Sequence, residues 1–394
     1  MPVRQPPRGG TAATFAPPIM EARRWLDGIE FPPDRPLLDV SQAAPMDPPP
    51  AALRQAIAEA ALNDPGAHLY GPVLGLPELR AEIADQWSSA YGGAIRPEQV
   101  AITQGCNQAF CAAVSAIAAA GDEVILPTPW YFNHKMWLDM AGVRAVPLST
   151  GANLLPEVQR TAALITPRTR AIVLVTPNNP TGLEYPAGLV AEVLALCRNH
   201  GIALILDETY RDFDGRDGAP HRLFADPDWG DTLIQLYSFS KAYRLTGHRV
   251  GALVAAEPIV AEVGKFLDTV AICANQLGQR AALWGLCNLA AWKADERAEI
   301  LARRTAVETG FAALPGWDLM GAGAFFAWVR HPFAIDSTTL ARRLVAEAGV
   351  LLLPGAMFLP EADPGSRDQL RIAFANIDRP GLRTLFQRLA AFRP

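Results

Sequence analysis

The sequence lacks the features that mark membrane proteins, nucleic-acid-binding proteins and disulfide-rich proteins. No apolar run reaches the ~18 residues that a membrane-spanning helix needs, so we expect no membrane partner. The formal net charge is −5 and no basic block interrupts the chain, which argues against a nucleic-acid partner. The cysteines are scattered without a Cys-x-x-Cys pair, which favours free thiols over disulfides or a metal site.

A targeting segment is also missing at the start of the sequence. Residues 1–8 are polar and proline-rich, without the apolar core of a signal peptide. Together with the free thiols, this composition predicts a cytoplasmic protein. Half of the 394 residues are apolar, which is enough for a large core and two domains.

The most informative stretch is Ser238-Phe239-Ser240-Lys241, which follows an apolar run of strand length. A lysine directly after a buried strand is unusual, because most lysines lie on solvated surfaces. The two serine hydroxyls and Arg249 supply hydrogen-bond donors that suit a phosphate group. A lysine beside a phosphate site suggests a Schiff-base nucleophile that holds a phosphorylated aldehyde cofactor.

Three further polar motifs each follow a short apolar run. They are Gly105-Cys106-Asn107 after residues 99–103, Asn179 after residues 171–175 and Asp207 after residues 202–206. The glycine turn opens a helix, whose free N–H groups form an anion site. Because the carboxyl ends of strands meet at one edge of an open α/β sheet, we expect these motifs and Lys241 to share one crevice. No G-x-x-x-x-G-K-[ST] motif occurs, which argues against a P-loop ATPase.

These motifs resemble those of the class I and II aminotransferases, which are fold-type I enzymes of pyridoxal 5'-phosphate (PLP). The resemblance covers about residues 38–374. It implies an α/β protein with a mostly parallel seven-stranded sheet between helices and a smaller α+β C-terminal domain. We place an N-terminal arm with part of the small domain at residues 1–45, the large PLP-binding domain at 46–285 and the small domain at 286–394.

The resemblance assigns a cofactor role to each motif. Lys241 resembles the Schiff-base lysine, Asp207 the partner of the pyridine nitrogen, and Tyr210 and Asn179 the partners of the phenolate oxygen. Tyr131 resembles the aromatic residue that stacks on the ring, with Trp130 as the second candidate. The remaining cofactor contacts fall to a set of residues around the phosphate. These are Gly105, Cys106, Asn107, Ser238, Ser240 and Arg249.

The resemblance also places the substrate and a partner subunit. Arg371 interrupts an apolar strand, where an unpaired charge is costly, and resembles the arginine that binds the substrate α-carboxylate with Asn179. Ala43 and Ala44 border the substrate where the family often has glycine. Tyr70 resembles the tyrosine that reaches the cofactor phosphate of the neighbouring subunit, which implies a homodimer with shared active sites.

The expected reaction moves an amino group between an L-amino acid and a 2-keto acid by a ping-pong mechanism. A PLP-dependent lyase that eliminates at the β- or γ-carbon, such as a C–S lyase, shares the same residues and stays an alternative. A non-catalytic PLP-binding regulator is a remote alternative. Such regulators join this fold to a winged helix, for which the proline-rich residues before Leu38 leave no room.

The expected substrate pocket is apolar and aromatic. Its candidate residues are Trp130, Tyr131, Phe325 or Phe326, Met357 and Phe358. Asn107 stands where an aspartate-specific branch of the family carries a lysine. An apolar pocket gains free energy by burying a side chain and loses it by desolvating a charge. We therefore predict that neutral donors, methionine-like or aromatic, are preferred over aspartate.

Overall fold

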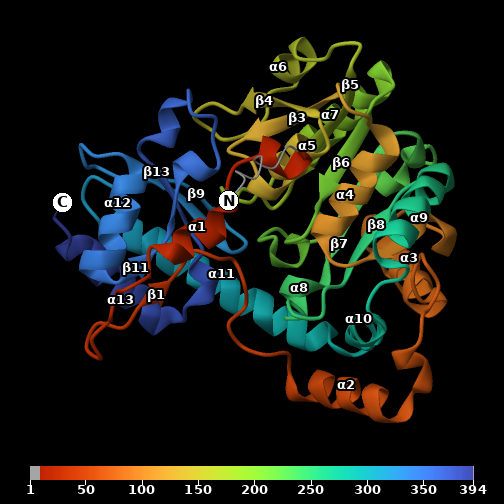
Figure 1. The fold of residues 1–394 in the computed structure, drawn as a ribbon, viewed down its shortest axis with the longest axis horizontal. Helices are drawn as coiled ribbons and strands as arrows, with labels where there is room; N and C mark the ends of the chain where they lie inside the picture. The colour runs from red at the N-terminus through yellow and green to blue at the C-terminus, as the bar shows by residue number, and fades with distance from the viewer. Residues whose placement is uncertain (1–8, 394) are drawn as a thin grey trace, which may run out of the picture.

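Seven strands form the largest sheet of the computed structural model, which describes residues 9–393. Their order is β2-β8-β7-β6-β5-β3-β4 (Figure 1). The bounds are Val100–Thr103 for β2, Glu123–Thr128 for β3, Arg144–Ser149 for β4, Thr169–Val175 for β5, Ala203–Asp207 for β6, Leu233–Ser238 for β7 and Gly251–Val254 for β8. Strand β8 runs antiparallel to both of its neighbours, and the other neighbouring pairs are parallel. This confirms the predicted mostly parallel seven-stranded sheet.

Helices cover both faces of this sheet, as short and wholly apolar strands require. Helices α4 (Cys106–Ile117), α5 (Phe132–Met140) and α9 (Glu257–Ala271) pack with one set of strand side chains. Helices α3 (Pro77–Tyr91), α7 (Ala187–His200) and α10 (Gln276–Asn288) pack with the alternate set. Because side chains alternate along a strand, each central strand contributes to both layers. Helices α2 (Ala51–Asn63), α6 (Val158–Ala163) and α8 (Phe239–Ala242) complete this part of the chain.

A second lobe contains an antiparallel sheet in the order β12-β13-β10-β9. The bounds are Asp318–Gly323 for β9, Phe326–Arg330 for β10, Leu353–Pro354 for β12 and Gln369–Ile372 for β13. Helices α12 (Ser337–Arg343) and α13 (Arg379–Ala391) belong to this lobe. Helix α11 (Ala290–Ala312) runs from the large sheet to this smaller one (Figure 1).

The N-terminal segment joins the second lobe. Strand β1 (Leu38–Asp39) pairs in parallel with β11 (Val350–Leu351), and helix α1 (Pro18–Arg24) lies between the lobes (Figure 1). The first eight residues of the predicted arm lie outside the described residues. The limits that we gave for the domains stay predictions.

Two boundaries differ from the sequence expectation for identifiable reasons. The apolar run of residues 324–329 predicts a strand, but β10 begins at Phe326, because Ala324 has a φ of +45°, which an extended strand excludes. The sequence of residues 337–349 predicts one helix, but α12 ends at Arg343 and continues as a π-helical turn over Leu344–Ala348. Strand β4 was not predicted, because it is a half-exposed edge strand that contains a proline. Within residues 9–393 no helix combines the length and the apolarity of a membrane span.

The start of helix α4 packs directly on strand β8. Gly251 lies opposite Thr103 in the β2–β8 register. A Cβ at Gly251 would lie 2.7 Å from the carbonyl carbon of Gly105 and 2.8 Å from the amide nitrogen of Cys106. Both neighbours are backbone atoms, so the contact cannot be relieved by a side-chain rotation.

We therefore expect Gly251→Ala to lower the free energy of unfolding by about 1–3 kcal/mol, the usual cost of overpacking. Gly247→Ala is the matched control, because nothing lies within 4 Å of a Cβ at Gly247. Its free energy of unfolding should change by no more than about 0.5 kcal/mol. Denaturant titration of both variants measures the difference, and equal effects would contradict the close packing.

Candidate active site

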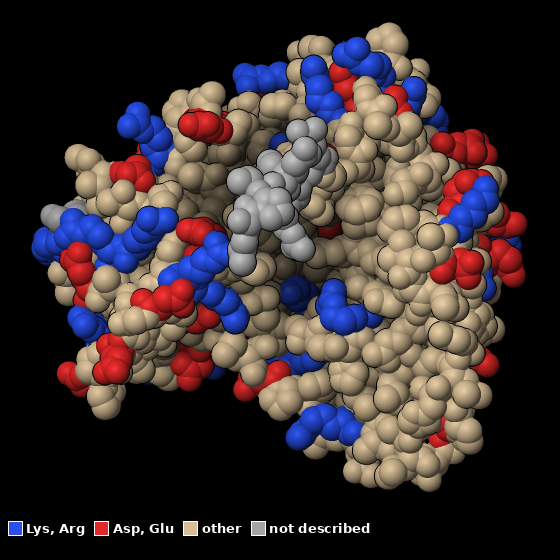
Figure 2. Space-filling view, viewed as in Figure 1, with Lys and Arg blue, Asp and Glu red and all other residues tan. Residues whose placement is uncertain are grey.

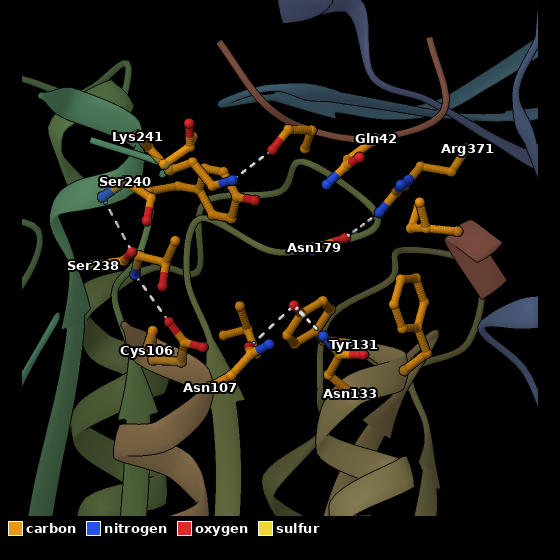
Figure 3. A pocket seen from close by; sticks show the side chains of 18 of the residues that line it. Gln42, Cys106, Asn107, Tyr131, Asn133, Asn179, Ser238, Ser240, Lys241 and Arg371 are labelled. Atoms are coloured by element: carbon orange, nitrogen blue, oxygen red, sulfur yellow. Dashed lines mark hydrogen bonds between the residues drawn. The ribbon is translucent and has the colours of Figure 1, made fainter. Parts of the chain in front are cut away.

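A cavity of about 390 Å³ lies at the carboxyl ends of β5, β6 and β7. Figure 2 shows a hollow between the two lobes with Lys and Arg atoms inside it. Most predicted site residues line this cavity (Figure 3). They are Ala43, Cys106, Asn107, Tyr131, Asn179, Asp207, Tyr210, Ser238, Ser240, Lys241, Arg249 and Arg371. Topology therefore brings together motifs that lie far apart in the sequence.

Lys241 lies in the short helix α8, directly after strand β7. Ser238 caps this helix, and its Oγ accepts a hydrogen bond of 3.3 Å from the Ser240 amide. The Lys241 Nζ donates to the carbonyl oxygen of Ala43. Burial, together with the charges of Arg249 and Arg371, lowers the pKa of Lys241 to about 8. The neutral amine is therefore a minority near pH 7, but its share is far larger than in an ordinary lysine, which favours action as a nucleophile or base.

Asp207 ends strand β6 and is 3% exposed. The His134 Nε2 lies 3.3 Å from one carboxylate oxygen, and the Thr209 amide donates to the other at 2.9 Å. Burial by itself raises the pKa of Asp207, but His134 and Thr209 outweigh it, so the net pKa lies below the ordinary value. Asp207 is therefore an ionised carboxylate inside the protein, available to pair with a protonated nitrogen.

Sequence reasoning missed His134. Its ring stacks on Phe110 with 3.9 Å between centroids, and its edge meets Tyr131. Tyr131 precedes helix α5 as its N-cap, so His134 lies three residues further on the same helix face. That spacing from the predicted stacking residue was the available signal.

Arg249, the two serines and the start of helix α4 form an anion site. The Arg249 Nη1 donates to the Ser240 Oγ at 3.4 Å and to the Thr246 carbonyl at 3.0 Å. Gly105 has a φ of +82°, and a Cβ at this position would collide with the Arg249 guanidinium. The glycine therefore lets the guanidinium lie close to the start of α4. Within residues 9–393 Arg249 forms no ion pair with a carboxylate. A guanidinium, two hydroxyls and a helix N-terminus fit a doubly charged phosphate.

Arg371 is a buried cation on strand β13, at 2% exposure. Its Nη1 donates to the Asn179 Oδ1 at 2.9 Å, its Nη2 donates to the Ser41 carbonyl, and its Nε has no partner. Burial lowers the pKa of Arg371 to about 10. Among the described residues no carboxylate pairs with it, so the site is suited to an anion that enters the cavity.

Most side chains of the predicted substrate pocket do not line the main cavity. Phe326 and Phe358 are fully buried and pack against the Arg371 guanidinium, with centroids 5.0 and 4.8 Å from its Cζ. Trp130 and Met357 pack in the hydrophobic cores, and Phe325 borders a separate cavity of about 210 Å³. Of that set only Tyr131 lines the main cavity. The residues that do line this side were not predicted: Ile19, Gln42, Phe132 and Asn133.

Three predicted residues lie outside the cavity lining. Gly105 contributes only its backbone at the start of α4. The amide of Ala44 donates to the Asn376 Oδ1 at 3.2 Å, so Ala44 faces the second lobe. Tyr70 is 80% exposed and borders a surface hollow that also reaches Arg249. A contact between Tyr70 and the phosphate of a second subunit stays a prediction.

Helix α11 holds the chain just downstream of three cavity residues. Arg304 of α11 pairs at 3.0 Å with Glu184, which lies five residues after Asn179. Lys293 of α11 pairs at 3.0 Å with Asp212, which lies five residues after Asp207. Glu296 of α11 pairs at 2.7 Å with Arg244, which lies three residues after Lys241. One helix therefore fixes the relative positions of three loops that build the site.

Comparison with known proteins gives a consistent result. The sequence profile of the family "Aminotransferase class I and II" matches residues 35–389. The chain is 30% identical over 336 residues to the aromatic aminotransferase ISS1 of Arabidopsis thaliana, covering 83% of this chain and 82% of that protein. It is 32% identical over 323 residues to the arginine–pyruvate transaminase AruH of Pseudomonas aeruginosa, covering 79% and 80%.

A solved structure shows the same architecture. The aspartate aminotransferase of Thermus thermophilus, in its structure with maleate, superposes with a TM-score of 0.86 at 26% identity, covering 98% of this chain and 99% of that one. The family profile, the curated relatives and the fold agree, and the chain therefore belongs to the class I and II aminotransferase family and is a transferase enzyme.

Proposed function

We propose that this protein is a PLP-dependent aminotransferase that moves an amino group between a neutral or aromatic L-amino acid and a 2-keto acid by a ping-pong mechanism. The observation that carries the proposal is the cavity itself. It joins a lysine of lowered pKa, a buried carboxylate and two cations that lack carboxylate partners among residues 9–393. The reported relatives are aminotransferases, which favours transfer over β- or γ-elimination.

Different residues of the cavity would bind different parts of PLP. Arg249, Ser238, Ser240 and the N–H groups that open α4 would hold the phosphate. Asp207 would hold a proton at the ring nitrogen, because an adjacent carboxylate favours the charged form. When bound, PLP supplies an electron sink next to the α-carbon of the substrate.

The remaining groups act on the substrate. Arg371 would bind the α-carboxylate through its guanidinium, with Asn179 fixing the orientation. Lys241, as a neutral amine, would remove the α-proton of the substrate and deliver it to the carbonyl carbon of the cofactor. Asn179 and Tyr210 would both contact the phenolate oxygen of the cofactor. The same groups serve both half-reactions, as a ping-pong mechanism requires.

The lining of the cavity supports a neutral donor side chain. Lys241, Arg249 and Arg371 are its cations among the described residues, and each already has a role above. Other side chains of the lining are amides and apolar groups. These are Gln42, Asn107, Asn133, Ile19 and Phe132. A second substrate carboxylate would therefore be desolvated without a cation from this chain.

A homodimer in the cytoplasm completes the proposal. Leu69 and Tyr70 line the hollow that reaches Arg249 and are 66% and 80% exposed. Val270 and Ile272, on either side of the lining residue Ala271, are 57% and 42% exposed. An exposed apolar cluster of this kind marks a protein–protein contact. A second copy of this chain would cover it and bring Tyr70 to the partner's phosphate site. The five cysteines are free thiols, in keeping with a reducing compartment.

We predict that Lys241→Ala abolishes keto-acid-dependent turnover but still binds PLP non-covalently, because Arg249 and Asp207 remain. Lys265→Ala is the matched control, since the Lys265 side chain is 72% exposed on α9. Turnover and equilibrium dialysis with PLP measure the two effects. Substantial activity in Lys241→Ala would remove Lys241 from its assigned role.

Covalent attachment of PLP should depend on pH through Lys241. Only the neutral amine attacks, so the rate of attachment to the apo-protein should rise with pH through about 8 and level off above it. Arg371→Leu removes one of the positive charges that lower this pKa, so its midpoint should move upward. Stopped-flow absorbance measures both midpoints, and an unshifted midpoint would show that Arg371 does not act on Lys241.

The donor preference is tested with one acceptor and three donors. We expect kcat/KM for methionine or phenylalanine to exceed that for aspartate, and Asn107→Lys to raise the relative value for aspartate. A lead of aspartate by tenfold in the unmodified enzyme, equivalent to about 1.4 kcal/mol in transition-state binding, would contradict the preference.

A further inference from the structure

A second set of buried charges lies behind the cavity, and no step proposed above uses it. Asp207 faces the cavity, whereas Glu208 points to the opposite side of the sheet, because side chains alternate along an extended chain. The Glu208 side chain is 0% exposed, and its partners lie under helix α3.

The Glu208 carboxylate has three partners from three separate segments. Its Oε2 accepts from the Tyr91 hydroxyl of α3 at 2.8 Å and from the Gln235 Nε2 of β7 at 2.6 Å. The His221 Nε2 lies 3.2 Å from its Oε1. The carboxylate therefore connects the end of β6 to the neighbouring strand, to a helix and to a loop.

Arg211 closes these contacts into a ring. Its Nη1 donates to the Tyr91 hydroxyl at 3.1 Å, and its guanidinium carbon lies 3.4 Å from the centroid of the Trp87 ring. The Trp87 Nε1 donates in turn to the Gln235 Oε1 at 2.9 Å. The ring thus returns to Glu208 through Gln235 and fixes the chain at residues 208 and 211.

Stability alone gives little reason for such a ring, because replacing buried ionic groups with apolar ones is often neutral or stabilising. The ring does determine geometry. Residues 208 and 211 lie on either side of Thr209 and Tyr210. The whole segment 208–211 directly follows Asp207. This segment is a turn outside the sheet, where the Glu208 amide makes the last strand-like hydrogen bond, at 2.9 Å to the Leu236 carbonyl.

We propose that Glu208 is a positioning residue for the cofactor site. Its buried carboxylate holds residues 207–210 so that the Asp207 carboxylate and the Tyr210 hydroxyl keep their places in the cavity. The inference rests on the proposed function, because it concerns the groups that would contact PLP. A misplacement of about 1 Å in a reacting group can cost about a hundredfold in rate.

Glu208→Gln tests this, because it removes the charge and keeps the shape. Glu123→Gln is the matched control. Glu123 is also hidden from solvent, though nearer the surface, pairs with Arg168 at 2.9 Å and accepts from Thr166 at 2.6 Å, but lies at the amino end of β3, the opposite end of the sheet. Both variants lose a buried carboxylate from the same sheet, and only one should disturb the cavity.

The measurements are the dissociation constant of PLP, the pH midpoint of the absorbance of the lysine-linked cofactor, and kcat and KM separately. For Glu208→Gln we expect about tenfold weaker PLP binding, a shifted midpoint and a loss of about a hundredfold that falls mainly on kcat. For Glu123→Gln all of these should stay at the wild-type values even if the apo-protein melts at a lower temperature.

Wild-type values in a folded Glu208→Gln, or equal changes in both variants, would overturn the positioning role. If Glu208→Gln does not fold, Tyr91→Phe replaces it, because this change removes only the hydroxyl that joins Glu208 to Arg211. Weaker PLP binding with a shifted midpoint in Tyr91→Phe supports the role, and wild-type values overturn it. A wild-type protein that binds no PLP would refute the proposed function, and this inference with it.

Discussion

Among the residues that the structure describes, three cations share one cavity with a single carboxylate, and the rest of the site depends on this imbalance. Lys241, Arg249 and Arg371 line the cavity together with its carboxylate, Asp207, which lies 3.3 Å from the His134 Nε2. Arg371 is buried without a carboxylate partner among the described residues, and burying such a charge costs several kcal/mol. The cavity is therefore prepared for anions, and a phosphate and a carboxylate satisfy the two arginines. Burial, together with these positive neighbours, lowers the pKa of Lys241 to about 8, so the cavity also increases the share of the neutral amine.

The protein sustains this unfavourable arrangement because the surrounding framework is rigid. The central strands β5, β6 and β7 are buried on both faces, and their carboxyl ends deliver Asn179, Asp207 and Lys241 to the cavity. Helix α11 then ties the following segments together through one ion pair for each segment. Behind the cavity, the ring around Glu208 holds the turn after β6. The active-site groups lie on loops, but each loop is fixed within a few residues of the group that it carries.

The sequence predicted which motifs would meet in one cavity where topology alone determines it. Asp207, Asn179 and Lys241 each follow an apolar run, and strand ends must meet at one edge of a parallel sheet. The sequence-based prediction failed where it had to decide whether an apolar side chain faces the cavity or the protein core. Phe326 and Phe358 were expected to meet substrate, but they pack against the Arg371 guanidinium, which an apolar pattern cannot distinguish. The polar lining was missed because Gln42 and Asn133 carry no local signal, and Ala324 shortened a strand through a backbone angle that composition does not encode.

The central claim is that the charge imbalance makes Lys241 the attachment point of PLP. The most direct measurement incubates the protein with PLP, reduces the linkage with borohydride and maps the modified peptides by mass spectrometry. The account predicts that Lys241 carries the label and that the other lysines of the chain, Lys135, Lys265 and Lys293, do not. Lys135 and Lys265 are each paired with carboxylates on their own helices, and Lys293 is held by Asp212. A label on any of these three in place of Lys241, or no label at all, would contradict the account.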